Sequence, residues 1–459
     1  MQADILIENG LIITLDDERR IIKDGAIAVA GDKIAALGKT AELKKEYSAK
    51  KVIDARDKVV APGFVDCHVH VTQHMGKGFV PDDVAAVPWI FDWQLKIYPH
   101  MDSDDQYTSA LLAFTEMIKT GTTCFCEAFT AYEPECLAKA MEETGIRGVI
   151  GRHTWDIPSE PKQTRATTEQ ALESLERVIT EYHGRAQGRI NAWAHLIGIG
   201  TATDALLQGA KRLADKYRVG LAMHQSVTPD EVEEYARQRG KRPIEHFQEL
   251  GILDRNLLLV HMLDVSDKEV ELLGAHSVNI AHCPTSALRL AYGATKIGRF
   301  PEMMEAGANV CLGCDGANCS NHLDMGRCVY LAAGIFKDCR MDINQIPAEL
   351  ALEMGTINGA RALLLEDEIG SLQPGKKADL VLYDRLRPEW VPLLHPVRSL
   401  VYSADGKSVD TVIIDGQLVM EEGQLTRIDE QALYREAQER AEKLMRRTGL
   451  ELRSRWKTI

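Results

Sequence analysis

The chain lacks several features that would point to membranes or nucleic acids. None of its 459 residues belongs to an apolar run that approaches the ~20 residues a membrane-spanning helix needs. Acidic residues outnumber basic ones, and the formal charge of −14 argues against nucleic acid or an anionic membrane as the main partner. The first residues, Met-Gln-Ala-Asp, lack the basic start and apolar stretch of a secretory signal. We therefore expect a cytoplasmic protein that acts on a small molecule.

The ten cysteines show no pair of pairs with zinc-finger spacing. Cys311 and Cys314 have the spacing of a redox motif, but they lie in an apolar, strand-like run with no second pair nearby. We therefore expect reduced thiols that pack in the core.

The central part of the chain alternates short apolar runs with amphipathic stretches. Helices are expected between the runs, for instance over Glu135–Thr144 and Pro229–Arg239. Eight runs read as strands: Gly63–Val69, Thr122–Cys126, Arg147–Gly151, Ile190–Leu196, Val219–His224, Leu257–His261, Val278–His282 and Asn309–Cys314. Eight β-α units predict an α/β fold with a (β/α)8, TIM-like barrel over residues 61–369.

Both ends of the chain are predicted to form short strands. Ala3–Glu8 and Leu11–Leu15 flank an Asn-Gly turn signal, and Asp415-Gly416 predicts a hairpin. Residues 1–60 and 370–459 are therefore expected to form one small antiparallel β unit, with the barrel inserted and a closing helix over Glu430–Thr448.

Chemically competent side chains recur at the ends of the expected barrel strands, where the active sites of such barrels lie. They are His68, His70, His224, His261, His282 and Asp315. A strand period of two puts the first two imidazoles on one side of their strand. Three imidazoles and a carboxylate suit zinc, iron or cobalt, and such an ion makes hydroxide available at neutral pH. Asp315 could take the proton of that water, and His261 or His282 could protonate the leaving group.

The segment Val60-Ala61-Pro62-Gly63-Phe64-Val65-Asp66-Cys67-His68-Val69-His70 resembles the first-strand signature of the amidohydrolase superfamily. Two further segments, 282–286 and 313–317, are similar to signatures of one branch, which holds S-adenosylhomocysteine and methylthioadenosine deaminases, guanine deaminases and triazine hydrolases. The segment 370–381 resembles the lead into that family's β-sandwich. The resemblance spans nearly the whole chain. It implies a barrel with a β-sandwich from both chain ends, a metal-dependent hydrolase of non-peptide C–N bonds, and a homo-oligomer, a dimer or higher.

When the family's site residues are matched to this chain position by position, the resemblance implies one divalent ion. Zinc is expected first, and iron or cobalt are alternatives. Its ligands would be His68, His70, His224 and Asp315. His261 would act with Asp315 in proton transfer, and His282 would lie near the pocket. Members with two ions use a carboxylated lysine from the fourth strand, which has no lysine here.

The chain departs from this branch at two places. Deaminases carry a glutamate three residues after the fifth-strand histidine, and this chain has Val227 there. Asp230 and Glu231 follow closely, but we expect them to be charges at a helix N-terminus. Adenosine-type deaminases show His-x-Pro-Tyr after strand four, where this chain has His195-Leu196-Ile197-Gly198.

These departures leave two hydrolase readings open. One is an aminohydrolase of a purine, pterin or triazine ring. The other is hydrolysis of an amide, urea or (thio)carbamate, as in the phenylurea and molinate hydrolases, and Val227 favours it. A metal-free binding or assembly protein is a remote alternative, because the ligand set is complete. Gly198-Ile199-Gly200 lacks the third glycine of a dinucleotide site.

Further substrate-binding candidates are weaker. His195 and His282 end strands, and Arg152 and Asp156 follow the third strand, where they could bind substrate or form a structural salt bridge. Trp93 lies in an aromatic segment with Trp89 and Phe91. That segment could line a pocket or serve ordinary loop packing.

Overall fold

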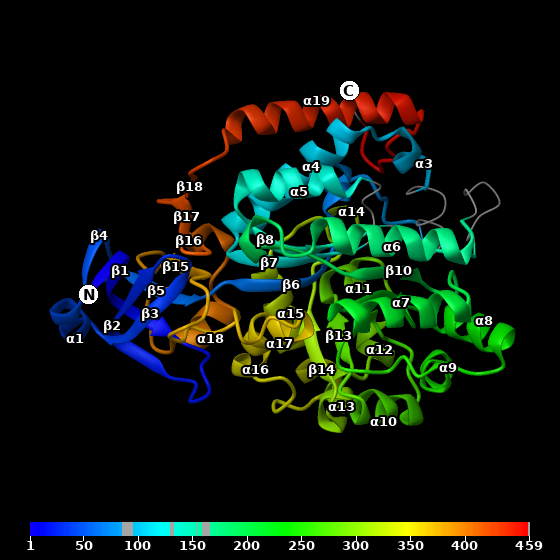
Figure 1. Cartoon of the computed structure of the whole chain (residues 1–459), viewed down its shortest axis with the longest axis horizontal. Helices are drawn as coiled ribbons and strands as arrows, with labels where there is room; N and C mark the ends of the chain where they lie inside the picture. Colours follow the sequence, from blue (N-terminus) through cyan, green and yellow to red (C-terminus); the bar gives the residue numbers. More distant parts are fainter. Residues whose placement is uncertain (85–94, 129–132, 153, 158–165, 458–459) are drawn as a thin grey trace.

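The structure is a computed structural model that describes residues 1–84, 95–128, 133–152, 154–157 and 166–457. A barrel with an outer layer of helices lies beside a β-sandwich built from both chain ends, and helix α19 (Glu430–Thr448) lies across α4 at the top of Figure 1. No helix in these residues combines the length and apolar character needed to cross a membrane.

The barrel strands are all parallel and run in two sheets that meet edge to edge. They are β6 (Phe64–Val69), β7 (Thr122–Glu127), β8 (Arg147–Ile150), β9 (Ile190–Ala192), β10 (Ala194–Gly198), β11 (Leu221–Gln225), β12 (Leu257–His261), β13 (Asn279–His282) and β14 (Asn309–Leu312). The expected fourth strand is therefore two strands. Trp193 separates them, and its amide still bonds to Ile150 while that of Ala194 bonds to Gly220. The other junction lies at the mouth, where the amide of Asp315 donates to the carbonyl of His68 at 2.8 Å.

Helices cover the outside of the barrel, and local capping residues set where they begin and end. They include α4 (Ser103–Lys119), α5 (Pro134–Thr144), α6 (Thr168–Tyr182), α7 (Asp204–Tyr217), α8 (Pro229–Arg239), α9 (Pro243–Leu250), α10 (Asp267–Ala275), α13 (Phe300–Ala306), α15 (Met325–Arg340), α16 (Ala348–Met354) and α17 (Ile357–Ala362). Asp102 and Asp105 form a capping box, so α4 begins at Ser103, earlier than apolar periodicity alone indicates. Gly145 ends α5 with a left-handed φ of 81°.

Shorter helical segments line the mouth or pack beside the barrel. They are η1 (Val71–Gly76), α3 (Leu95–Ile97), η3 (Tyr98–His100), η4 (Ala186–Gly188), α11 (Pro284–Arg289), α12 (Ala294–Ile297), α14 (Ala317–Ser320), α18 (Pro396–Tyr402) and η5 (Gly406–Ser408). Of these, η1 and α14 directly follow the first and last barrel strands, so they contact each other beside the candidate site.

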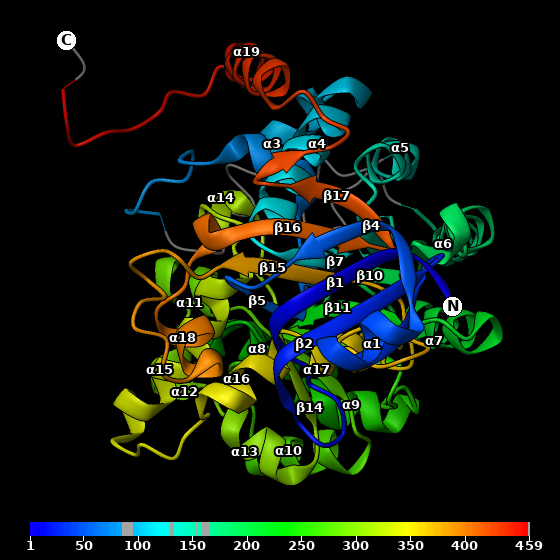
Figure 2. The same cartoon turned by 90° about the vertical axis from the view of Figure 1, so that its left-hand side faces the viewer.

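The β-sandwich is one continuous sheet that folds over an aliphatic core. Its strands are β1 (Gln2–Ile13), β2 (Ile21–Ala30), β3 (Lys33–Lys39), β4 (Ser48–Asp54), β5 (Lys58–Pro62), β15 (Leu380–Asp384), β16 (Val409–Ile414), β17 (Gln417–Glu421) and β18 (Gln424–Leu425), with α1 (Thr40–Glu46) between β3 and β4. Strands from the two chain ends pair directly, β5 with β15, as Figure 2 shows in blue and orange. Ile7, Ile27, Leu380 and Ile413 are fully buried in its core.

Two expectations about this unit are wrong and one is confirmed. Asn9-Gly10 is not a turn between two strands, because Asn9, with a φ of 64°, sits at an irregularity inside the single strand β1. The unit is also not purely antiparallel, since β1 pairs in parallel with β4 and β5. The hairpin at Asp415-Gly416 is confirmed, and both residues have the positive φ that such a turn requires.

A buried ion cluster joins the barrel to the sandwich. Arg147, at the start of β8, donates to Asp379 at 2.7 Å and to Asp415 at 2.9 Å, and its side chain is fully buried. Because both carboxylates belong to the C-terminal segment, this arginine ties that segment to the barrel.

Candidate metal centre

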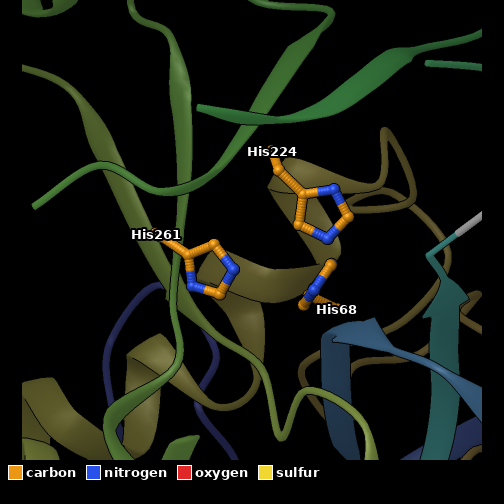
Figure 3. Close-up of side chains that lie close together, drawn as sticks. All are labelled: His68, His224 and His261. Carbon is orange, nitrogen blue, oxygen red and sulfur yellow. The ribbon is translucent and has the colours of Figure 1, made fainter. Parts of the chain in front are cut away.

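Three imidazole rings converge at the mouth of the barrel from three different strands. His68 lies near the end of β6, His224 lies in β11 and His261 ends β12, and Figure 3 shows their rings turned toward one common space. The ring centre of His68 lies 4.8 Å from that of His224 and 5.5 Å from that of His261. Candidate ligand atoms of the three residues all lie within 4.8 Å of one another.

A carboxylate and a fourth imidazole complete the cluster. The Nε2 atom of His70 lies 3.3 Å from Oδ1 of Asp315, and the Nε2 atom of His68 lies 3.7 Å from the same oxygen. His68, His70 and Asp315 form a second group with ligand atoms within 4.8 Å. Since His68 belongs to both groups, the five side chains surround one centre rather than two.

The backbone around the cluster is held in unusual conformations. His261 and Asp315 have left-handed φ values of 75° and 65°, which non-glycine residues adopt at a cost of roughly 1–3 kcal/mol. The buried carboxylate of Asp66 accepts from the amides of His68 and Cys314 at 3.2 and 3.0 Å, so it fixes the first and last strands to each other. Burial raises the pKa of Asp66 to about 7.

The protonation states suit metal binding. Burial lowers the pKa of His68 and His224 well below the usual value, and it lowers the pKa of His261 to about 4. These imidazoles are therefore neutral at pH 7 and can offer a lone pair. Burial alone would raise the pKa of Asp315, but the hydrogen bond with His70 and favourable electrostatic interactions with the nearby histidines hold this pKa well below its ordinary value.

A hydrogen bond orients one of the candidate ligands. Nδ1 of His224 donates to the carbonyl of Ile197 at 2.8 Å, which leaves Nε2 as its candidate ligand atom. Four imidazoles and one carboxylate that surround a common space at the barrel mouth fit a divalent ion of the zinc type. The chain therefore holds a candidate site for a divalent metal.

The other candidates from the sequence lie in different places. The ring of His282 packs on Phe300, with ring centres 3.9 Å apart, and contacts Phe336. His195 is buried, and its Nε2 atom lies 3.8 Å from Cys126 Sγ. The structure therefore does not bring either residue into the histidine cluster.

Arg152 and Asp156 lie in the loop after β8 but form no ion pair with each other in the part of the chain that the structure describes. Arg152 donates to the hydroxyl of Ser174 at 3.3 Å. Both carboxylate oxygens of Asp156 accept hydrogen bonds, from the amide of Thr203 at 2.8 Å and from the hydroxyl of Thr168 at 2.7 Å. Asp156 thus holds this loop against α7. Trp93, Trp89 and Phe91 lie outside the described residues.

Glu231 has a larger role than a charge at a helix start. It lies in the first turn of α8, as expected, but its carboxylate folds back to accept from the amides of Ser226 at 3.2 Å and Val227 at 2.9 Å. Burial raises its pKa to about 7. The side chain therefore braces the loop that carries Val227.

Sequence reasoning missed Gln73, which lies in η1, three residues after His70. It is 5% exposed, and neither its amide oxygen nor its nitrogen has a hydrogen-bond partner among the described residues. Its oxygen lies close to Gly316, the residue after Asp315, since a Cβ there would be 2.4 Å from it. A polar residue close behind the histidine pair is the one sequence signal that could have found it.

The cysteines are all free, and those at positions 311 and 314 are buried. The expectation of thiols packed in the core is confirmed at these two positions.

Residues 59–419 match the sequence profile of the Amidohydrolase family. The chain belongs to this family. It is 34% identical over 447 residues to a 5-methylthioadenosine/S-adenosylhomocysteine deaminase from Caldanaerobacter subterraneus subsp. tengcongensis, a match that covers 96% of this chain and 99% of that protein. This amidohydrolase thus falls in the branch of the methylthioadenosine and S-adenosylhomocysteine deaminases, as the resemblance implied.

Solved structures agree with this placement. A zinc-bound adenosine deaminase from Xanthomonas campestris superposes with a TM-score of 0.89 at 27% identity, covering 97% of this chain and 99% of that one. A zinc complex of atrazine chlorohydrolase from Arthrobacter aurescens superposes with a TM-score of 0.88 at 20% identity, covering 95% and 100%, and so shows the same fold. The chain is accordingly a metal-dependent amidohydrolase that acts on non-peptide C–N bonds.

Proposed function

We propose that this amidohydrolase is an aminohydrolase that releases ammonia from the aminated ring of a purine nucleoside, of the 5′-methylthioadenosine and S-adenosylhomocysteine class. The observation that carries the proposal is the cluster of four imidazoles and Asp315 at the barrel mouth. Similarity to a deaminase over almost the full length of both chains supports the choice of substrate class.

We further propose one zinc ion, held by His68, His70, His224 and Asp315, with His261 beside it in proton transfer. A bound divalent ion supplies hydroxide at neutral pH, because it lowers the pKa of water to about 7. Asp315 is ionised and can accept a proton and deliver it to the leaving amine. His261 is neutral and 5% exposed, so it can orient the ring by a hydrogen bond.

A second candidate is hydrolysis of an amide, urea or (thio)carbamate, and Val227 favours it. This residue is 6% exposed and offers no proton where deaminases carry a glutamate. Glu231 lies nearby, but its carboxylate is occupied by the backbone amides of the loop. In an amide-type substrate the leaving nitrogen needs the proton and no ring nitrogen has to accept one.

A substrate panel separates the two candidates. Zinc-loaded protein is assayed for ammonia release from 5′-methylthioadenosine, guanine, a pterin and a triazine, and for amine release from phenylureas, carbamates and anilides. The Asp315→Asn variant controls for contaminating activity. The proposal expects ammonia from the nucleoside at the highest kcat/KM. Amine release from a urea or carbamate, without ammonia from any ring, would instead establish the second candidate.

We also propose the assembly and organisation that the sequence indicates. The chain would work as a homo-oligomer in the cytoplasm, with its parts divided at residues 1–60, 61–369 and 370–459. Light scattering on the purified protein tests the first point, because a mass of one chain at micromolar concentration would exclude an oligomer.

A further inference from the structure

Tyr292 follows the seventh barrel strand and turns into the metal centre. The chain leaves α11 at Arg289, and Ala291 then adopts a left-handed φ of 55°. The amide of Tyr292 bonds back to Ala287 at 3.0 Å, which closes the turn. Left-handed backbone at a non-glycine residue is unfavourable and often accompanies a functional constraint. Here it sets the direction of the phenol ring.

The phenol ring of Tyr292 contacts the histidine cluster at the ring of His261. The two ring centres lie 5.7 Å apart with an angle of 82° between the planes. Tyr292 is only 6% exposed. Burial raises its pKa well above the ordinary value, and the charges of Cys319 and Asp315 raise it further. The phenol therefore stays protonated and can act as a hydrogen-bond donor.

The hydroxyl forms no hydrogen bond to another residue within the described ranges of the chain, and its oxygen is not among the fully buried atoms without a partner, so it keeps some accessible surface. A phenol oxygen that keeps some accessible surface can bond to a molecule that enters the site, while its ring stays buried. A bound molecule is the partner that this arrangement can accept.

We propose that the hydroxyl of Tyr292 donates a hydrogen bond to the ring nitrogen of the bound substrate, on the His261 side of the site. This inference rests on the proposed aminohydrolase function and names a substrate-contacting residue for it. Negative charge grows on that nitrogen as the adjacent ring carbon is attacked. The phenol keeps its proton and stabilises the charge, as preorganised donors do. In this way it serves part of the role that a glutamate has in related deaminases.

Tyr292→Phe removes only the hydroxyl and keeps the ring that packs on His261. For 5′-methylthioadenosine we expect kcat to fall about 10- to 100-fold, with KM changed less than about threefold. Bound zinc and the unfolding midpoint should stay at the wild-type values. Tyr217→Phe is the matched control, because it loses a hydroxyl bonded to Glu176 at 2.7 Å on the outside of the barrel. Equal kcat in Tyr292→Phe and wild type would overturn the proposal.

A second measurement needs no turnover. Acetohydroxamate, a small metal chelator with polar oxygens, is titrated calorimetrically into the zinc-loaded wild type and the two variants. Loss of one hydrogen bond should weaken its binding to Tyr292→Phe about fivefold, and leave Tyr217→Phe unchanged. If the wild type does not deaminate the nucleoside, the proposed function fails, and this titration alone decides the role of Tyr292. Equal affinity in all three proteins would then overturn that role.

Discussion

The Nε2 atom of His70 lies 3.3 Å from Oδ1 of Asp315, although one residue follows the first barrel strand and the other follows the last. The contact closes the barrel at its mouth and places a carboxylate among the imidazoles of the cluster. Asp315→Asn keeps the shape of this residue but removes the charge. We expect the variant to lose turnover by at least about 1000-fold and to bind zinc more weakly. Elemental analysis after dialysis against limiting zinc measures the second effect, and wild-type zinc content with full turnover would contradict the assignment.

Substitutions of Val227 test whether the reaction lacks a proton donor at the position where related deaminases carry a glutamate. Val227→Glu places a carboxyl where related deaminases carry one, in surroundings that raise its pKa by burial. If protonation of the ring limits the rate, ammonia release from 5′-methylthioadenosine should rise about tenfold or more. Val227→Gln introduces a side chain of nearly the same size as glutamate but without an acidic proton, so the rate of ammonia release should not rise. An equal rate in the two variants would show that an added acid is not what the reaction lacks.

Arg147 should be essential for joining the two parts of the chain. Replacing it with methionine leaves the buried carboxylates of Asp379 and Asp415 without this partner. Such an uncompensated charge costs about 3–5 kcal/mol. Urea unfolding at pH 7 should show this loss, although the residue lies away from the metal centre. Arg185→Met is the control, because its ion pair with Glu135 is exposed and should contribute less than about 1 kcal/mol.

Glu116 gives the protein a pH-dependent stability. Its Oε2 atom lies 3.0 Å from Nε2 of His74 and its Oε1 atom accepts from the amide of Leu323 at 3.0 Å, so it ties the loops after the first and last barrel strands to α4. Burial alone would raise its pKa, but the bonds with His74 and Lys77 hold the folded-state pKa far below the ordinary value. A carboxyl whose pKa is lower in the folded state than in the unfolded state stabilises the folded protein at pH values above the unfolded pKa of about 4.3. This stabilisation is lost as the pH falls below that value.

Glu116→Gln should therefore cost about 1–3 kcal/mol of unfolding free energy at pH 7. The difference from the wild type should shrink as the pH is lowered from 5 toward 3. Chemical denaturation across this range measures it. A difference that stayed constant over the same range would mean that the ionised carboxylate is not the source of the stability.

The sequence allowed the barrel and most of the metal centre to be predicted, because both depend on local periodicity. The His-x-His pair of His68 and His70 needs only the period of a strand, and each lone ligand ends an apolar run. His282 meets the same criterion, yet its ring faces Phe300 and Phe336. Which side of a strand faces the barrel interior depends on register with its neighbours, and a single run does not reveal that register.

Other features depend on contacts between distant segments. The split at Trp193 and the irregularity at Asn9 arise from pairing partners rather than from local composition. Tyr292 was not predicted, because its direction depends on the left-handed turn at Ala291 and on the ring of His261. Glu231 was expected only as a helix charge, since its bonds to Ser226 and Val227 require the loop to fold back onto α8.

The most direct test of the metal centre is a zinc titration of the chelated protein. Turnover of 5′-methylthioadenosine is followed as zinc is added back, and bound zinc is measured in the same samples. We expect no turnover without metal and a linear rise in turnover that stops at one zinc per chain. Wild-type turnover in the metal-free protein would contradict a metal-dependent reaction.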